Sequence, residues 1–217
     1  MTHRLIFVCE ANICRSPLME LVLRAQGDAA GWQISSAGTR VGTAGNRMCV
    51  TSAEIAEAAG DAETPILAAG HRSEAIDAAE LRAADLILTA SRAERSAVAA
   101  AAPEARSRAF TLREAIHLGA EPVDAREFEI IAEFDADAAS TTGLARYAEA
   151  LHARRGFTAP PKTSRTLFGR RRNPFDIADA HHDSTREHRA MLTSTSAEVV
   201  QFLRQAAAFL DSAAGSR

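Results

Sequence analysis

The chain has 217 residues, of which 47% are hydrophobic and 24% are charged, and its formal net charge is -3. This composition is typical of a folded domain with one core, and the negative charge gives no support to nucleic-acid binding. No apolar run approaches the roughly 18 residues of a membrane span. Residues 1–4 lead straight into the first apolar segment without a signal peptide, so we expect a cytoplasmic protein with no integral membrane segment.

Residues 5–8 form a short apolar run, which predicts a buried strand that delivers Cys9 to its carboxyl end. A helix is predicted from Ser16, with Ser16 as its N-cap, Pro17 at the first helical position and apolar residues at helical spacing behind them. The loop between strand and helix therefore ends on a helix N-terminus. Unpaired N–H groups there favour a bound anion.

The rest of the chain alternates between strand and helix patterns. Strands are predicted at residues 32–36, 85–89 and 108–111, and helices at 49–59, 93–102, 127–134, 144–154 and 187–212. Alternation of this kind predicts an α/β fold, a three-layer sandwich with a four-stranded parallel sheet and a ligand site at the carboxyl end of the first strand. We expect a single domain over residues 1–217, in which a helical and loop elaboration at 119–172 precedes the C-terminal helix.

The segment after the first strand combines a candidate nucleophile with a residue that can bind phosphate. Cys9 is followed after five residues by Arg15, whose planar guanidinium can hold two oxygens of a phosphoryl group at once. Only the thiolate of a cysteine attacks phosphorus, and the same positive groups that favour the thiolate also stabilise the transition state of phosphoryl transfer. The pattern therefore predicts a phosphocysteine intermediate.

The segment VCEANICRSPLME, residues 8–20, resembles the signature of the low-molecular-weight protein-tyrosine phosphatase family of bacterial type. Further resemblance lies in SSAGT at 35–39, HRS at 71–73 and ADLILT at 84–89. The similarity covers about residues 5–118 and resumes near Phe175, so 119–172 departs from the family. It implies hydrolysis of phosphotyrosine in proteins without a metal or other cofactor. Since many bacterial relatives sit beside tyrosine kinases, a bacterial tyrosine kinase or its targets are candidate partners.

The resemblance also implies roles for particular residues. Cys9 would be the nucleophile and Arg15 the phosphate clamp, while Ser16 stabilises the thiolate. Asn12 would brace the loop in a strained turn, held by Ser36 and His71. The alternative interpretation of His71 is an ordinary surface histidine. The phosphate-binding residues implied are Glu10, Ala11, Asn12, Ile13, Cys14, Arg15 and Ser16.

The family supplies its general acid from an Asp-Pro-aromatic loop, which this chain lacks. The nearest segment is NPFDIADAH at 173–181, in which Asp179 and Asp176 compete for the role. We align Asp179 with the acid, because the final helix then starts at the expected distance. Ala180 stands where proline is usual, which predicts a less rigidly aimed acid. In a purely structural interpretation both aspartates cap the last helix.

Other groups leave alternatives open. Cys9 and Cys14 are close enough in sequence for a reversible disulfide, although Cys14 is also interpreted as a packed small residue, and Cys49 as structural. A metal site of His181, His182, Asp183 and His188 is conceivable, but solvated side chains fit better because no common helical face is evident. A basic cluster, Arg165 with Arg170, Arg171 and Arg172, is interpreted as a solvated loop.

Two other functions compete with phosphotyrosine hydrolysis. A phosphate or phosphopeptide binding module that has lost efficient turnover would fit Ala180 and the unfamiliar middle segment. A thiol-dependent arsenate reductase would need further cysteines to relay a disulfide, and the sequence has none after Cys49. Ile13 favours phosphotyrosine, because relatives that resemble arginine phosphatases carry threonine there.

Overall fold

The computed structural model describes residues 2–42, 45–122, 143–161, 173–181 and 183–215. Four parallel strands form the sheet, in the order β2-β1-β3-β4. Their bounds are β1 Arg4–Cys9, β2 Gln33–Gly38, β3 Leu86–Thr89 and β4 Ala109–Thr111. The predicted α/β fold with a four-stranded parallel sheet is therefore confirmed, and each predicted strand is found within two residues of its expected bounds.

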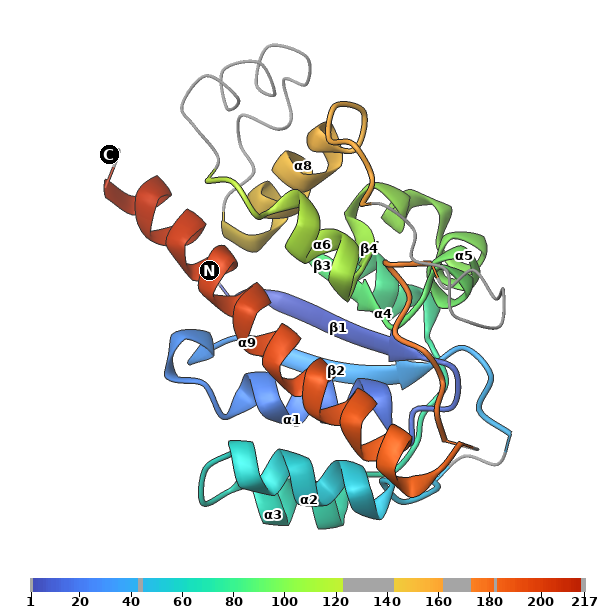
Figure 1. Ribbon diagram of the computed structural model, residues 1–217. Coiled ribbons are helices and arrows are strands. Elements are labelled where there is room, and N and C mark those ends of the chain that lie inside the picture. Colours follow the sequence, from blue (N-terminus) through green and yellow to red (C-terminus); the bar gives the residue numbers. More distant parts are fainter. Residues whose placement is uncertain (1, 43–44, 123–142, 162–172, 182, 216–217) are drawn as a thin grey trace.

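Helices cover both faces of this sheet (Figure 1). The longer ones are α1 Arg15–Arg24, α2 Val50–Ala59, α5 Arg92–Ala101, α8 Gly143–Arg154 and α9 Thr185–Gly215. The shorter ones are α3 Thr64–Gly70, α4 Ala78–Ala83 and α6 Leu112–Leu118, with the 3-10 helices η1 Gly27–Ala29 and η2 Pro103–Arg108. None of these helices is both long and apolar enough to cross a membrane.

Alternate residues of the strands point to opposite faces of the sheet, and an apolar cluster lies on each face. Leu5, Phe7 and Leu88 point to the face covered by α1, α6 and α9, where the larger apolar cluster lies. Ile6 and Val8 point to the opposite face and pack with residues of α4, α5 and η2. Because the strands are buried on both faces, they appear in the sequence as continuous apolar runs rather than as alternating patterns.

The C-terminal helix α9 crosses the face of the sheet beside α1 and α2 (Figure 1). Its buried residues include Leu192, Val199, Phe202 and Leu203. The helix is longer at both ends than the predicted range 187–212. The segment 173–181, which precedes α9 in the chain, reaches the carboxyl end of the sheet, where the N–H of Ile177 donates to the carbonyl oxygen of Ala90 at 2.8 Å.

Part of the middle segment also belongs to this core. Helix α8 confirms the prediction for residues 144–154, and its Leu144, Tyr147 and Leu151 join the same apolar cluster as β1 and α9. Helix α8 therefore packs into the same core as the sheet and α9. The predicted helix at 127–134 and the basic cluster from Arg165 to Arg172 lie outside the described residues.

Candidate active site

The loop after β1 surrounds the sulfur of Cys9, the last residue of that strand. Cys9 is 2% exposed, and its Sγ accepts a hydrogen bond from the backbone N–H of Asn12 at 3.3 Å. The Ser16 hydroxyl lies 3.1 Å from the same sulfur. Two polar groups of the loop, one N–H and one hydroxyl, therefore contact the buried sulfur.

The start of α1 differs from the sequence prediction. The helix begins at Arg15, Cys14 occupies the N-cap position, and no side chain caps the helix there. Ser16 is fully buried, and its hydroxyl contacts Cys9 Sγ, the Asn12 side-chain amide and the Ala37 carbonyl oxygen. The prediction that Ser16 is the N-cap and Pro17 the first helical residue is therefore wrong. The Ser16 hydroxyl contacts the Cys9 sulfur instead of capping the helix.

Asn12 holds the loop in a conformation that is unusual for a residue other than glycine. Its φ is 55°, in the left-handed region, which asparagine tolerates better than most residues. The side-chain Nδ2 donates to Ser16 Oγ and Ser36 Oγ, each at 2.9 Å, and Oδ1 accepts from the backbone N–H of Glu74. His71 Nε2 donates to the Asn12 carbonyl oxygen at 2.9 Å. The structure thus brings Asn12, Ser36 and His71 together, with Ser36 accepting from Asn12.

This network predicts a stability effect. We expect Asn12→Ala to lower the free energy of unfolding by about 2–4 kcal/mol, because three side-chain hydrogen bonds are lost and alanine strains the left-handed backbone. Asn12→Gly is the matched control, since glycine adopts this φ freely and should recover about 1 kcal/mol of the loss. Urea denaturation measures both changes. A loss below about 0.5 kcal/mol in Asn12→Ala would contradict the bracing role.

Arg15 is the buried cation of the site. It is 4% exposed, and its Nη1 donates to the Ile177 carbonyl oxygen at 3.3 Å and lies 3.5 Å from Glu94 Oε1. Its Nη2 donates to Asp179 Oδ2 at 3.1 Å. A guanidinium fixed on three sides in this way keeps its orientation when a phosphoryl group arrives.

Glu94 is a site residue that the sequence interpretation missed. It lies in the first turn of α5, is 5% exposed, and its other carboxylate oxygen accepts from the Ser91 hydroxyl. The pattern Ser91-Arg-Ala-Glu94 has the spacing of a capping box, so the sequence offers a sufficient structural reason for the glutamate. Only the fold reveals that Glu94 also faces Arg15.

The two candidate acids occupy different environments. Asp179 is exposed, with its side chain at 47%, and its carboxylate contacts Arg15 and the backbone N–H of His181. Asp176 accepts from the backbone N–H and the guanidinium of Arg92 at the start of α5. Asp179 therefore faces residues 9–16 after β1, which we call the phosphate loop, whereas Asp176 faces the start of α5. Neither carboxylate caps α9.

A cavity of about 310 Å³ opens above the loop. Its lining consists of Cys9, Glu10, Ala11, Ile13, Cys14 and Arg15 from the loop, with Arg40, Asp179 and His181. Asn12 and Ser16 lie beneath the cavity, fully buried, as supports of the loop. At the mouth, Glu10 Oε1 accepts from Arg40 at 2.9 Å, so its charge is balanced by a neighbour rather than exposed alone to a substrate.

Beside this cavity, the thiols of Cys14 and Cys49 meet. Their mutual hydrogen bond raises the pKa of Cys14 and lowers the pKa of Cys49, and burial raises the Cys14 pKa further. Cys14 Sγ also lies 3.3 Å from His181 Nδ1. All three cysteines are free thiols, so a disulfide between Cys9 and Cys14 stays a prediction. The sequence did not indicate that Cys49 would approach the phosphate loop.

The fold resembles those of solved phosphatase structures. A tyrosine phosphatase of Erwinia amylovora, AmsI, superposes with a TM-score of 0.57 at 17% identity, covering 98% of this chain and 93% of that one. The arginine phosphatase YwlE of Geobacillus stearothermophilus gives a TM-score of 0.55 at 19% identity, covering 93% and 91%. At these identities the likeness concerns the fold.

The sequence comparisons are more specific. A low molecular weight protein-tyrosine-phosphatase of Streptomyces coelicolor is 51% identical over 43 residues, which is 18% of this chain. The matched segment spans about a quarter, 26%, of that relative's length. Residues 4–127, more than half of the chain, match the family described as low molecular weight phosphotyrosine protein phosphatase. With the sheet order and the loop after β1 in agreement, the chain belongs to that family.

Proposed function

We propose that this protein hydrolyses phosphotyrosine in protein substrates, with Cys9 as the nucleophile, Arg15 as the phosphate clamp and Asp179 as the general acid. One observation carries the proposal: these three side chains line the same cavity of about 310 Å³, although Asp179 lies 170 residues after Cys9 in the sequence. A buried sulfur, a guanidinium and a carboxyl group around one cavity are the groups that phosphoryl transfer to cysteine requires.

The first half of the reaction forms the covalent intermediate. The Cys9 thiolate attacks phosphorus as the bond to the tyrosine oxygen breaks, and protonated Asp179 gives its proton to that oxygen. Phosphocysteine and neutral tyrosine result. The Arg15 guanidinium and the N–H groups of the loop balance the charge on the phosphoryl oxygens, and because they are fixed in advance they need little reorganisation.

In the second half, Asp179 acts as a base. Its carboxylate takes a proton from a water molecule, which attacks phosphorus and displaces the Cys9 thiolate. Inorganic phosphate leaves, and Asp179 is again protonated. In the free protein Arg15 Nη2 donates to Asp179, so a bound phosphoryl group competes for this donor and releases the carboxyl group toward the leaving oxygen.

The proposal also specifies phosphotyrosine as the class of substrate. Ile13 lines the cavity and offers an apolar contact for the aromatic ring of a phosphotyrosine. A phosphotyrosine side chain is also long enough to bring its phosphate to the buried sulfur. A bacterial tyrosine kinase or its targets are the partners that this chemistry would serve.

Three peptides of one sequence test the proposal, carrying phosphotyrosine, phosphoserine or phosphoarginine. We expect kcat/KM for phosphotyrosine to exceed both others by at least about 100-fold, the discrimination that about 2.7 kcal/mol of differential binding gives. Release of inorganic phosphate is the measurement. Preference for phosphoarginine would refute the substrate class while leaving the phosphatase chemistry intact, and no release from any peptide would refute both.

A further inference from the structure

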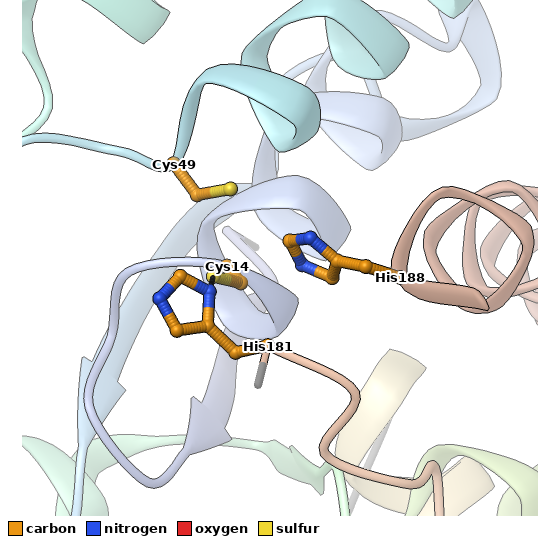
Figure 2. A group of neighbouring side chains, drawn as sticks. All are labelled: Cys14, Cys49, His181 and His188. Atoms are coloured by element: carbon orange, nitrogen blue, oxygen red, sulfur yellow. Dashed lines mark hydrogen bonds between the residues drawn. The ribbon is translucent and has the colours of Figure 1, made fainter. Parts of the chain in front are cut away.

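Four side chains with metal-ligating atoms meet at the edge of the phosphate loop (Figure 2). They are Cys14, Cys49, His181 and His188, and one ligand atom of each lies within 4.8 Å of the other three. They come from four separate parts of the chain: the N-caps of α1 and α2, the segment that carries Asp179, and the second turn of α9. Figure 2 shows His188 reaching from α9 toward the other three residues.

The backbone holds these residues in place. The N–H of Cys49 donates to the carbonyl oxygen of Ile13 at 2.9 Å, which fixes the start of α2 against the phosphate loop. The N–H of His181 donates to Asp179 Oδ1 at 3.1 Å. Helix α9 packs on both α1 and α2, so His188 approaches from a rigid element. The ligand atoms are therefore brought together by the fold itself.

His188 supplies an independent sign that a ligand belongs here. The residue is 7% exposed, and its Nε2 is buried without a hydrogen-bond partner in the part of the chain that the structure describes. Buried polar atoms of native proteins nearly always have a partner, and an ion is one way to supply it. The ring of His188 lies edge-on to that of His181, with 5.4 Å between the ring centroids.

We propose that Cys14, Cys49, His181 and His188 bind a zinc ion in a tetrahedral site. Two thiolates and two imidazoles are a preferred donor set for Zn²⁺. Zinc–ligand bond lengths imply distances of about 3.3–3.8 Å between ligand atoms, so side-chain rotations that contract the group by about 1 Å are enough. Zinc binding releases the thiol protons of Cys14 and Cys49 to solvent. Four protein ligands leave no open position, so the ion is structural.

This site lies apart from the nucleophile but shares a wall with its cavity, because Cys14 and His181 line both. A bound ion would join the phosphate loop, α2, α9 and the segment that carries Asp179. Ala180, the residue directly before His181, lacks the fixed φ that proline would provide. The ion therefore supplies from outside the segment the rigidity that its own sequence lacks.

Metal content of the reduced full-length protein tests the proposal. We expect one zinc per chain by mass spectrometry after dialysis, with a phosphine as reductant. At about 100 times the dissociation constant, zinc should raise Tm by about 5 °C or more. Cobalt in its place should give the intense visible bands of a tetrahedral ion with thiolate charge transfer. Protein that retains no zinc and gains no cobalt spectrum would refute the site.

Variants identify the ligands. His188→Gln and Cys49→Ser should each weaken zinc binding by more than about 100-fold and alter the cobalt spectrum. His188→Gln decides the matter if Cys49→Ser unfolds, because His188 Nε2 has no hydrogen bond to lose among the described residues. Asp183→Asn and Cys9→Ser are the matched controls and should retain one zinc. Loss of zinc in Cys9→Ser, or an unchanged spectrum in His188→Gln, would overturn the assignment.

Discussion

Replacement of Cys9 by serine is expected to lower kcat for an aryl phosphate by at least about 10⁴-fold, because the hydroxyl is not ionised at neutral pH and cannot form the phosphocysteine. The substitution changes one atom in a fully packed position, so the fold and the cavity should persist. Steady-state hydrolysis of p-nitrophenyl phosphate measures the loss. Acid-quenched reactions of the wild type should contain protein-bound phosphate, and those of the variant should not.

Two controls separate chemistry from folding in this experiment. The variant should keep its Tm within a few degrees of the wild type and should still bind vanadate or phosphate, since Arg15 and the loop are intact. If the variant turned over substrate within tenfold of the wild-type rate, Cys9 would not be the nucleophile. If it failed to fold, Cys9→Ala would be examined in its place.

The second large effect concerns the acid. Asp179→Asn should lower kcat by about 10²–10⁴-fold, whereas Asp176→Asn should lower it by less than tenfold. The physical reason is placement: Asp179 lines the cavity, while Asp176 accepts hydrogen bonds from Arg92. The Asp179→Asn loss should be larger for phenyl phosphate than for p-nitrophenyl phosphate, because the poorer leaving group depends more on protonation.

Asp176→Asn serves as the matched control, since it removes one carboxylate charge three residues away. Its expected effect is on stability, through the weakened contact between the segment and the start of α5. A loss of several decades in Asp176→Asn with little change in Asp179→Asn would reverse the assignment. Equal losses in both, accompanied by a fall in Tm, would indicate that the segment contributes only through its position.

The phosphate loop was predictable because its chemistry is local. Cys9 and Arg15, the proposed nucleophile and clamp, lie within seven residues between an apolar run and a helical pattern, so spacing alone brings them close together. The strands were equally predictable, since burial on both faces makes them continuous apolar runs. Short helices were missed: α3, α4 and α6 each have seven residues or fewer, which is too short for apolar periodicity to emerge.

Contacts between distant parts of the chain were not predictable. Glu94 beside Arg15 and Cys49 beside Cys14 depend on how α5 and α2 dock, and the sequence gives each residue an adequate local explanation. The set of possible metal ligands weighed in the sequence, for which solvated side chains were the preferred interpretation, differs from the cluster in the structure for the same reason. His181 and His188 do come together, but with two cysteines rather than with Asp183, and His182 lies outside the described residues. The prediction of Ser16 as N-cap was wrong because its contact with Cys9 outweighs the local preference of serine for that position.

The long helix α9 has a consequence for the nascent chain. Cys9 and Arg15 emerge from the ribosome early, together with β1 and α1, whereas Asp179, which contacts Arg15, lies 164 residues after it. Docking of α9 on α1 requires burial of Leu192, Val199 and Phe202. The contact between Arg15 and Asp179 can thus form only after residue 179 has been synthesised, and α9 completes the core later still.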